Sequence, residues 1–156
     1  MRLARVLRHA FIPEWVARRV FPAPSLRRIE QSIKAAARDG AAEIHFVVET
    51  ALPLHYLFRS RSSRRRAEDL FSQLKVWDTE HNNGVLIYVQ LVSRHIDIVA
   101  DRGVARKVAQ AEWNAICREM EQAFGRGAFE EGALAAIARI GALLERHFPR
   151  EQGHAL

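Results

Sequence analysis

The residues best suited to chemistry lie in a polar loop that directly precedes an apolar segment. Residues 78–84 read Asp-Thr-Glu-His-Asn-Asn-Gly, so that Asp78, Glu80 and Asn82 occupy alternating positions. Oxygen ligands alternate in this manner where a loop wraps a hard cation such as Ca²⁺ or Mg²⁺. The loop is therefore a candidate site for either divalent cation.

A purely structural interpretation of the same loop is also open. An EF-hand needs glycine at its sixth position and a bidentate glutamate at its twelfth, whereas Asn83 and Val89 stand at these positions. Asp78 can instead accept a hydrogen bond from its own backbone in a turn. Asn83 and Gly84 can supply the positive φ that a tight turn requires.

Two further carboxylates lie at the ends of predicted strands. Glu49 ends a strand at residues 43–49, and Asp101 follows a strand at residues 95–100. If both carboxylates face the 78–84 loop, they can hold a metal ion with it or divide acid and base roles. Each of them could equally cap a helix or pair with an arginine.

Length and composition limit the class of protein. The chain has 156 residues, 49% of them hydrophobic and 27% charged, which is typical of one globular domain with its own core. No run of eighteen apolar residues is present to span a bilayer. Cys117 is the only cysteine, so no internal disulfide can form. Arginines interrupt the first twenty residues, which disfavours an export signal and predicts a cytoplasmic protein, at most peripheral to the inner membrane.

Positive charge is concentrated in the first part of the chain. Residues 1–66 contain 14 basic and 5 acidic residues, a net charge of +9, whereas residues 67–156 contain 10 and 13, a net charge of −3. The basic residues include two groups, namely Arg2, Arg5 and Arg8, and then Arg64, Arg65 and Arg66. Such a surface can meet an anionic membrane or a groove on a protein partner. A solvated arginine surface is the plain alternative.

Specific nucleic-acid binding is not expected. The arginine run lacks interleaved aromatic residues and any recognisable reading helix. Trp77 and Tyr88 are expected in the core or in a pocket wall rather than as platforms for stacked bases.

Apolar spacing predicts the helices and the limits of the domain. Residues 1–22 are predicted as a basic helical extension, residues 23–149 as one domain, and residues 150–156 as a short tail. Ser25 is a candidate N-cap for the first helix of the domain, which Gly40 would end.

Three more helices are predicted further along the chain. One spans about residues 67–77, one carries an apolar stripe that begins at Trp113, and one ends near Phe148.

Two patterns predict the strands. Apolar residues alternate over residues 43–49, whereas residues 85–92 are apolar nearly throughout, as in a central strand covered on both faces. A tight reversal at residues 93–94 would pair this central strand with residues 95–100. The elements predict an α/β fold in which a small mixed β-sheet is sandwiched between α-helices, with an extra helical segment at the N-terminus.

Several of these segments resemble the TPM domain family. The resemblance covers roughly residues 25–148 and is carried by residues 82–89, by residues 94–103 ending at Gly103, by Trp113, by residues 124–129 with Gly132, and by Ala136 with Ile137. It implies a mixed sheet between helices, in agreement with the elements above. Some members of this family are acid phosphatases, and some bind calcium or other divalent ions.

The resemblance leaves three functional hypotheses. The first is an accessory binding protein with a divalent-metal site at Glu49, Asp78, Glu80, Asn82, Asn83 and Asp101, working at a membrane face with a protein partner. The second is a metal-assisted acid phosphatase, and the third is a binder of anionic membrane surfaces through the basic N-terminus. The family usually carries an acidic Asp-x-Ala-Gly stretch before its first helix, whereas residues 21–26 contain no carboxylate, a departure that favours a shortened, cytoplasmic member of the family.

Overall fold

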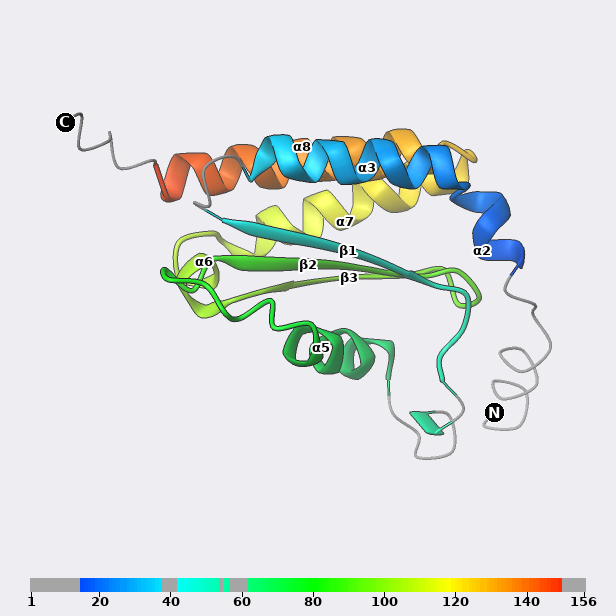
Figure 1. Ribbon diagram of the computed structural model, residues 1–156, viewed down its shortest axis with the longest axis horizontal. Helices are drawn as coiled ribbons and strands as arrows, with labels where there is room; N and C mark the ends of the chain where they lie inside the picture. Colours follow the sequence, from blue (N-terminus) through cyan, green and yellow to red (C-terminus); the bar gives the residue numbers. More distant parts are fainter. Residues whose placement is uncertain (1–14, 38–41, 54, 57–61, 150–156) are drawn as a thin grey trace.

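A three-stranded mixed sheet lies between helices on both of its faces (Figure 1). The computed structural model describes residues 15–37, 42–53, 55–56 and 62–149. Along these residues the elements are, in order, α2 (Trp15–Val20), α3 (Ala23–Ala36), β1 (Glu43–Glu49), α5 (Ser63–Gln73), β2 (Gly84–Gln90), β3 (His95–Ala100), α6 (Arg102–Ala105), α7 (Gln110–Gly125) and α8 (Phe129–His147). The predicted sandwich of a mixed sheet between helices is confirmed.

The strand directions define two ends of the sheet. β2 is central, with β1 parallel to it on one side and β3 antiparallel to it on the other. The polar loop leads into β2 at one end, where Gly84 pairs with Glu43; we call this the loop end. At the other end, Gln90 pairs with Glu49 and with His95; we call this the turn end, because the β2–β3 turn lies there. Seven residues of strand separate the two ends by about 20 Å.

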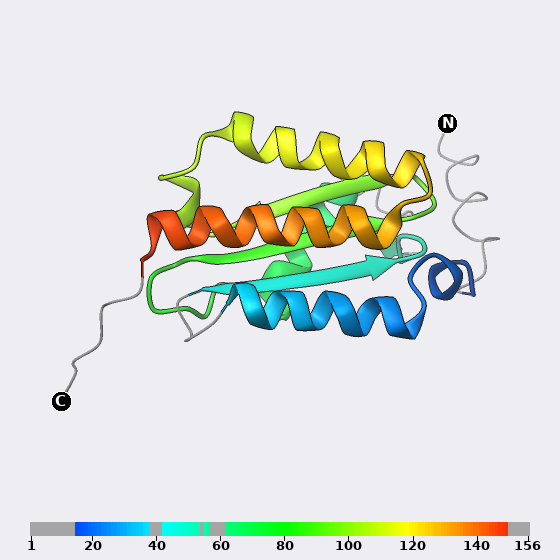
Figure 2. The same ribbon diagram turned by 90° about the horizontal axis from the view of Figure 1, so that it is seen from above.

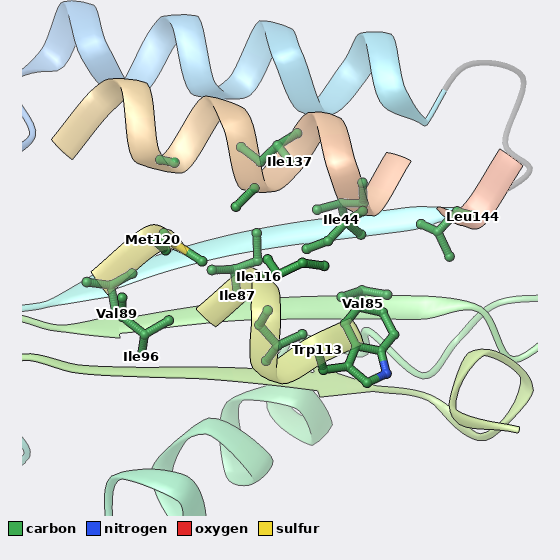
Figure 3. Packing of buried hydrophobic residues seen from close by; sticks show 14 of the residues in the cluster. Ile44, Val85, Ile87, Val89, Ile96, Trp113, Ile116, Met120, Ile137 and Leu144 are labelled. Carbon is green, nitrogen blue, oxygen red and sulfur yellow. The ribbon is translucent and has the colours of Figure 1, made fainter. Parts of the chain in front are cut away.

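The main core lies on the face that α3, α7 and α8 cover (Figure 2). Alternate residues Val85, Ile87 and Val89 of β2 point to this face, where they meet the apolar sides of the helices (Figure 3). Trp113 and Leu144 are among the helix residues buried there. Side chains on a strand alternate between its two faces, and those on a helix return to the same face about every 3.6 residues. The apolar side chains of each element therefore gather on one face, and these faces pack together. Burial of each large side chain stabilises the fold by about 1.5–3 kcal/mol.

The second face of the sheet is covered by α5. Leu86 and Tyr88 of β2 point to this face and pack against Ala67 and Leu70 of the helix. Every residue of β2 is buried, as the continuous apolar run predicts for a central strand.

The start of the domain differs from the prediction. Pro22, rather than Ser25, occupies the N-cap position of α3, and Ser25 is buried inside the first turns of the helix. Phe21, directly before this cap, is 2% exposed and packs edge-to-face on Phe46 and Phe129. This aromatic contact anchors α2 to the domain. The predicted helix end at Gly40 and the arginines Arg2, Arg5 and Arg8 lie outside the described residues.

The helix α5 and the β2–β3 turn are also displaced from their predicted limits. α5 begins at Ser63, because the Ser62 hydroxyl accepts a hydrogen bond from the Arg65 amide at 3.1 Å. The turn begins at Leu91 rather than Ser93. The Leu91 amide donates to the Glu49 carbonyl at 3.0 Å, a distance typical of strand pairing. None of the described helices combines the length and apolar character that a membrane span requires.

Candidate functional site

The loop that carries the candidate ligands is held by close backbone contacts. A Cβ atom on Gly84 would lie 2.0 Å from the Val76 carbonyl oxygen, so only glycine allows this approach. The positive φ of the loop is at Asn82 (52°), one residue before the predicted pair of Asn83 and Gly84. Asparagine tolerates this conformation better than most residues. The expectation that Asn83 and Gly84 supply the positive φ is wrong, and Gly84 is instead needed for its close approach to Val76.

The start of α6 packs directly against this loop. The Gly103 amide donates to the Asn82 carbonyl at 2.9 Å, and the Asp101 amide donates to the Gly84 carbonyl at 2.9 Å. A Cβ atom on Gly103 would lie 2.3 Å from the His81 carbonyl oxygen. The structure therefore brings Asp101 to the 78–84 loop at the loop end of the sheet, as its place after β3 predicts.

The two oxygens of the Asp101 carboxylate differ in their environment. Oδ1 accepts a hydrogen bond from the Arg102 amide at 2.7 Å, which makes Asp101 the N-cap of α6. Oδ2 is buried and has no hydrogen-bond partner among the residues that the structure describes. A buried carboxylate oxygen without a donor or a cation is costly, and this oxygen is the most unusual polar atom at the loop end.

The other candidate ligands of the loop are arranged differently. The side chains of Asp78, Glu80 and Asn82 are exposed, whereas Asn83 is buried and its amide donates to the Thr79 hydroxyl at 3.0 Å. Within the described part of the chain, no three histidine, cysteine, aspartate or glutamate side chains are grouped so as to hold one metal ion. Among these residues there is no cage of three such side-chain ligands at the loop end.

Glu49 does not belong to this site, contrary to the expectation from its strand position. β1 runs parallel to β2, so Glu49 lies at the turn end, while the loop before β2 lies at the loop end. Its carboxylate instead pairs with Arg66, whose Nε lies 2.7 Å from Oε1. The hydrogen bonds that Arg66 donates to the Glu49 carboxylate raise the pKa of Arg66. The alternative that Glu49 pairs with an arginine is the correct one.

The three consecutive arginines at the start of α5 have three different partners. Arg64 donates to the Ile98 carbonyl of β3 at 2.8 Å, Arg65 lies 3.3 Å from the Asp69 carboxylate, and Arg66 binds Glu49. They do not form a free basic patch. The run lies in the first turn of α5.

The two tryptophans that flank the site differ in burial. Trp113 is 5% exposed in the main core, whereas Trp77 is 49% exposed and donates its indole N–H to the Ser72 carbonyl at 3.2 Å. Of the two residues expected in the core or in a pocket wall, Trp77 lies outside the core and Tyr88 is fully buried within it.

The sequence did not lead us to expect one ionisable pair, which lies on β3. His95 and Asp97 share a face of β3, and the His95 Nε2 lies 2.8 Å from the Asp97 Oδ2. This hydrogen bond raises the pKa of His95, against the opposing effect of burial. The signal was present as two ionisable residues at i and i+2 in a strand, a spacing that puts them on the same face.

Comparison with known proteins relates the whole sheet and its helices to one family. The chain matches the model of the TPM domain over residues 17–143, from α2 into α8. It is also similar to the NMR structure of the BA42 protein from the psychrophilic bacterium Bizionia argentinensis. The two share 26% sequence identity and a TM-score of 0.73, over 85% of this chain and 86% of the other. No curated protein matches the chain.

Proposed function

Because the chain belongs to the TPM domain family, we propose that it is a binding protein that holds a divalent cation at Asp101 and the 78–84 loop. The observation that carries this proposal is the Asp101 Oδ2 atom, which is buried without a hydrogen-bond partner. A cation would compensate the negative charge of the Asp101 carboxylate, whose Oδ2 atom is buried away from water. Ca²⁺ is the better candidate, because it accepts carbonyl and amide oxygens in irregular geometry, whereas Mg²⁺ demands a near-octahedral set.

The residues of the site have distinct roles in this proposal. Asp101 supplies the charged ligand, and its hydrogen bond to the Arg102 amide fixes the orientation of the carboxylate. Gly103 holds the start of α6 against Asn82, so that cation binding would affect both the loop and the helix. Asp78 and Glu80 are exposed and would add long-range attraction or outer ligands. A bound cation would supply positive charge that links the loop to α6.

Titration with Ca²⁺ and with Mg²⁺, followed by backbone amide NMR, tests the proposal. We expect saturable shifts at residues 78–84 and 101–104 at millimolar cation, with the tighter binding for Ca²⁺. Asp101→Asn should abolish the shifts. Glu145→Gln, which removes an exposed carboxylate of α8, should leave them unchanged. Absence of shifts in the wild-type chain at millimolar Ca²⁺ would contradict the proposal.

A metal-assisted phosphatase is a second candidate that would use the same edge. Arg102 follows Asp101 directly and its side chain is exposed, and a guanidinium can bind phosphoryl oxygens beside a metal ion. The test is cation-dependent turnover of an aryl phosphate, which should be lost in Asp78→Asn and in Arg102→Gln. Cation binding without turnover in the wild-type chain would leave the binding protein as the function.

A peripheral contact with an anionic membrane is supported by the exposed face of α2. Trp15 is 57% exposed, and Arg18 and Arg19 follow it at the i+3 and i+4 positions, so the three share one face. Tryptophan prefers the membrane interface, and arginine attracts anionic headgroups.

Vesicle co-sedimentation tests this contact. The chain should sediment with phosphatidylglycerol-containing vesicles and not with pure phosphatidylcholine. Arg18→Glu with Arg19→Glu should abolish sedimentation, while the charge-matched pair Arg118→Glu with Arg146→Glu should not. Equal loss in both pairs would show a response to net charge alone.

A further inference from the structure

A pocket of about 390 Å³ lies at the turn end of the sheet, on the opposite side of the molecule from Asp101. α2 lies beside this end of the strands and beside the connection between α7 and α8 (Figures 1 and 2). The apolar wall is formed by Val16 and Val20 of α2, Val89 and Ile96 of the sheet, and Phe124 of α7 and Phe129 of α8, which flank the α7–α8 connection. Its volume falls within the range of about 300–1,000 Å³ that is usual for small-molecule sites.

The contact between α2 and the domain leaves an open pocket between them. Val16 and Val20 stand at i and i+4 on one face of α2, and both line the pocket. The helix has no buried residue of its own, so both valines keep part of their surface accessible to water. An apolar occupant would remove this surface from water.

Three charged side chains line the same pocket, and they differ in their pairing. Arg94 is exposed and adopts a φ of 50°, and its backbone amide donates to the Leu91 carbonyl at 3.2 Å. Its guanidinium forms no hydrogen bond or ion pair with any of the described residues. His95 is paired with Asp97, so its positive charge is largely compensated. Glu121 of α7 is exposed to solvent.

Arg94 is therefore the uncompensated cation of the pocket. Its guanidinium can form two parallel hydrogen bonds with a carboxylate. The left-handed backbone at Arg94 is unfavourable for a residue of this type and is maintained by the turn. The turn thus fixes the base of the arginine at the mouth of an apolar pocket.

We propose that this pocket binds a small molecule with an apolar body and a carboxylate, in which the body lies between α2 and the α7–α8 connection and the carboxylate pairs with Arg94. The proposal does not depend on the cation site, which lies at the other end of the sheet.

Three probes that each contain eight carbon atoms separate the contributions of the pocket and of the charge. Octanoate, octanol and octylammonium are titrated into the full chain without added Ca²⁺ or Mg²⁺, and binding is followed by amide NMR. We expect saturable shifts at residues 91–96 and 124–129, with affinity that falls from octanoate to octanol to octylammonium. Octylammonium binding as tightly as octanoate would overturn the proposal, as would the absence of saturable shifts with octanoate.

Variants assign the effect to particular residues. Arg94→Gln should weaken octanoate about tenfold and leave octanol unchanged, because one charge-assisted interaction is removed. Arg94→Lys should restore part of the loss, and Arg146→Gln, which removes an exposed arginine near the end of α8, should have no effect. Val16→Trp should fill the pocket and weaken both ligands. Unchanged octanoate affinity in Arg94→Gln would overturn the assignment even if Val16→Trp failed to fold.

Discussion

Arg66 binds both oxygens of the Glu49 carboxylate, with its Nε 2.7 Å from Oε1 and its Nη2 2.8 Å from Oε2. Tyr88 donates its hydroxyl to the same Oε1 at 2.9 Å. The side chains of Arg66 and Glu49 are only 14% and 22% exposed. This group joins α5 to the ends of two parallel strands, and burial together with the nearby Glu49 charge raises the pKa of Tyr88.

Removing the charge of Glu49 should destabilise the fold. Glu49→Gln leaves Arg66 without its anion in a mostly buried position, and we expect the free energy of unfolding to fall by about 2–3 kcal/mol. Urea denaturation followed by circular dichroism measures the change. Glu30→Gln removes one partner of the exposed Lys34 pair and should change stability by less than about 0.5 kcal/mol. A similar small effect in both variants would show that the Glu49 group contributes little.

A methyl group at Gly103 should strain the contact between the loop and α6. Its Cβ would lie 2.3 Å from the His81 carbonyl oxygen and 2.6 Å from that of Asn82, both of them backbone atoms. Gly103→Ala should therefore lower the free energy of unfolding by about 1–3 kcal/mol. Thermal denaturation provides the measurement.

Gly125 offers the matched control for this change. It is the last residue of α7, and a Cβ there would meet no atom within 4 Å. Gly125→Ala should preserve stability or raise it by up to about 1 kcal/mol through helix propensity. If Gly103→Ala were as stable as Gly125→Ala, the loop could move without cost and the close contact would not be required.

Protonation of His95 should stabilise the fold, so stability should be greater at low pH than at high pH around the pKa of this residue. The hydrogen bond with Asp97 raises the pKa of His95 above its ordinary 6.5. A base whose pKa is higher in the folded state stabilises the fold fully below its unfolded pKa, and this contribution is lost as the pH rises through the folded pKa. The free energy of unfolding should thus decrease as the pH rises from about 6 through the folded pKa of His95. The effect should be modest, because the side chain is 46% exposed.

Asp97→Asn should bring the pKa of His95 down, as read from the imidazole resonances in an NMR titration. The same variant should flatten the dependence of stability on pH in this range. An unchanged pKa of His95 in Asp97→Asn would assign the shift to another group, such as Glu121.

Cys117 should react slowly with thiol reagents in the folded chain. Burial, with a smaller effect of Glu121, raises the pKa of this thiol to about 11, so little thiolate is present at neutral pH. Modification by a disulfide reagent at pH 8 should be much slower than in urea, where the thiol recovers its ordinary pKa. Equal rates in the folded and unfolded chain would show that the thiol is accessible and ionised.

Local patterns in the sequence predict most of the fold. The alternation in β1, the continuous apolar run of β2 and the apolar stripe that begins at Trp113 are each visible within one element, and each predicts the face that the structure buries. Asp101 is also placed correctly, because it directly follows β3 and the hairpin returns it to the start of β2.

Other residues have positions or roles that the sequence did not predict, because these depend on tertiary contacts that no local sequence pattern contains. The position of Glu49 follows from the parallel pairing of β1 with β2, which is decided by packing over the whole domain. The need for Gly84 follows from the Val76 carbonyl, eight residues earlier in the chain. Trp77 is half exposed although it is a large apolar residue. Many apolar residues lie at protein surfaces, so residue type alone does not predict burial.

The hydrogen bond from Arg64 to Ile98 has a consequence for assembly of the chain. β3 is an edge strand, and Asp101 bonds to Gly84, so the alternation of an antiparallel ladder directs the Ile98 carbonyl away from β2. An outward carbonyl of this kind can accept a strand from another molecule and start aggregation. Arg64 occupies this acceptor with a charged side chain, so α5 both covers one face of the sheet and opposes its extension by a foreign strand.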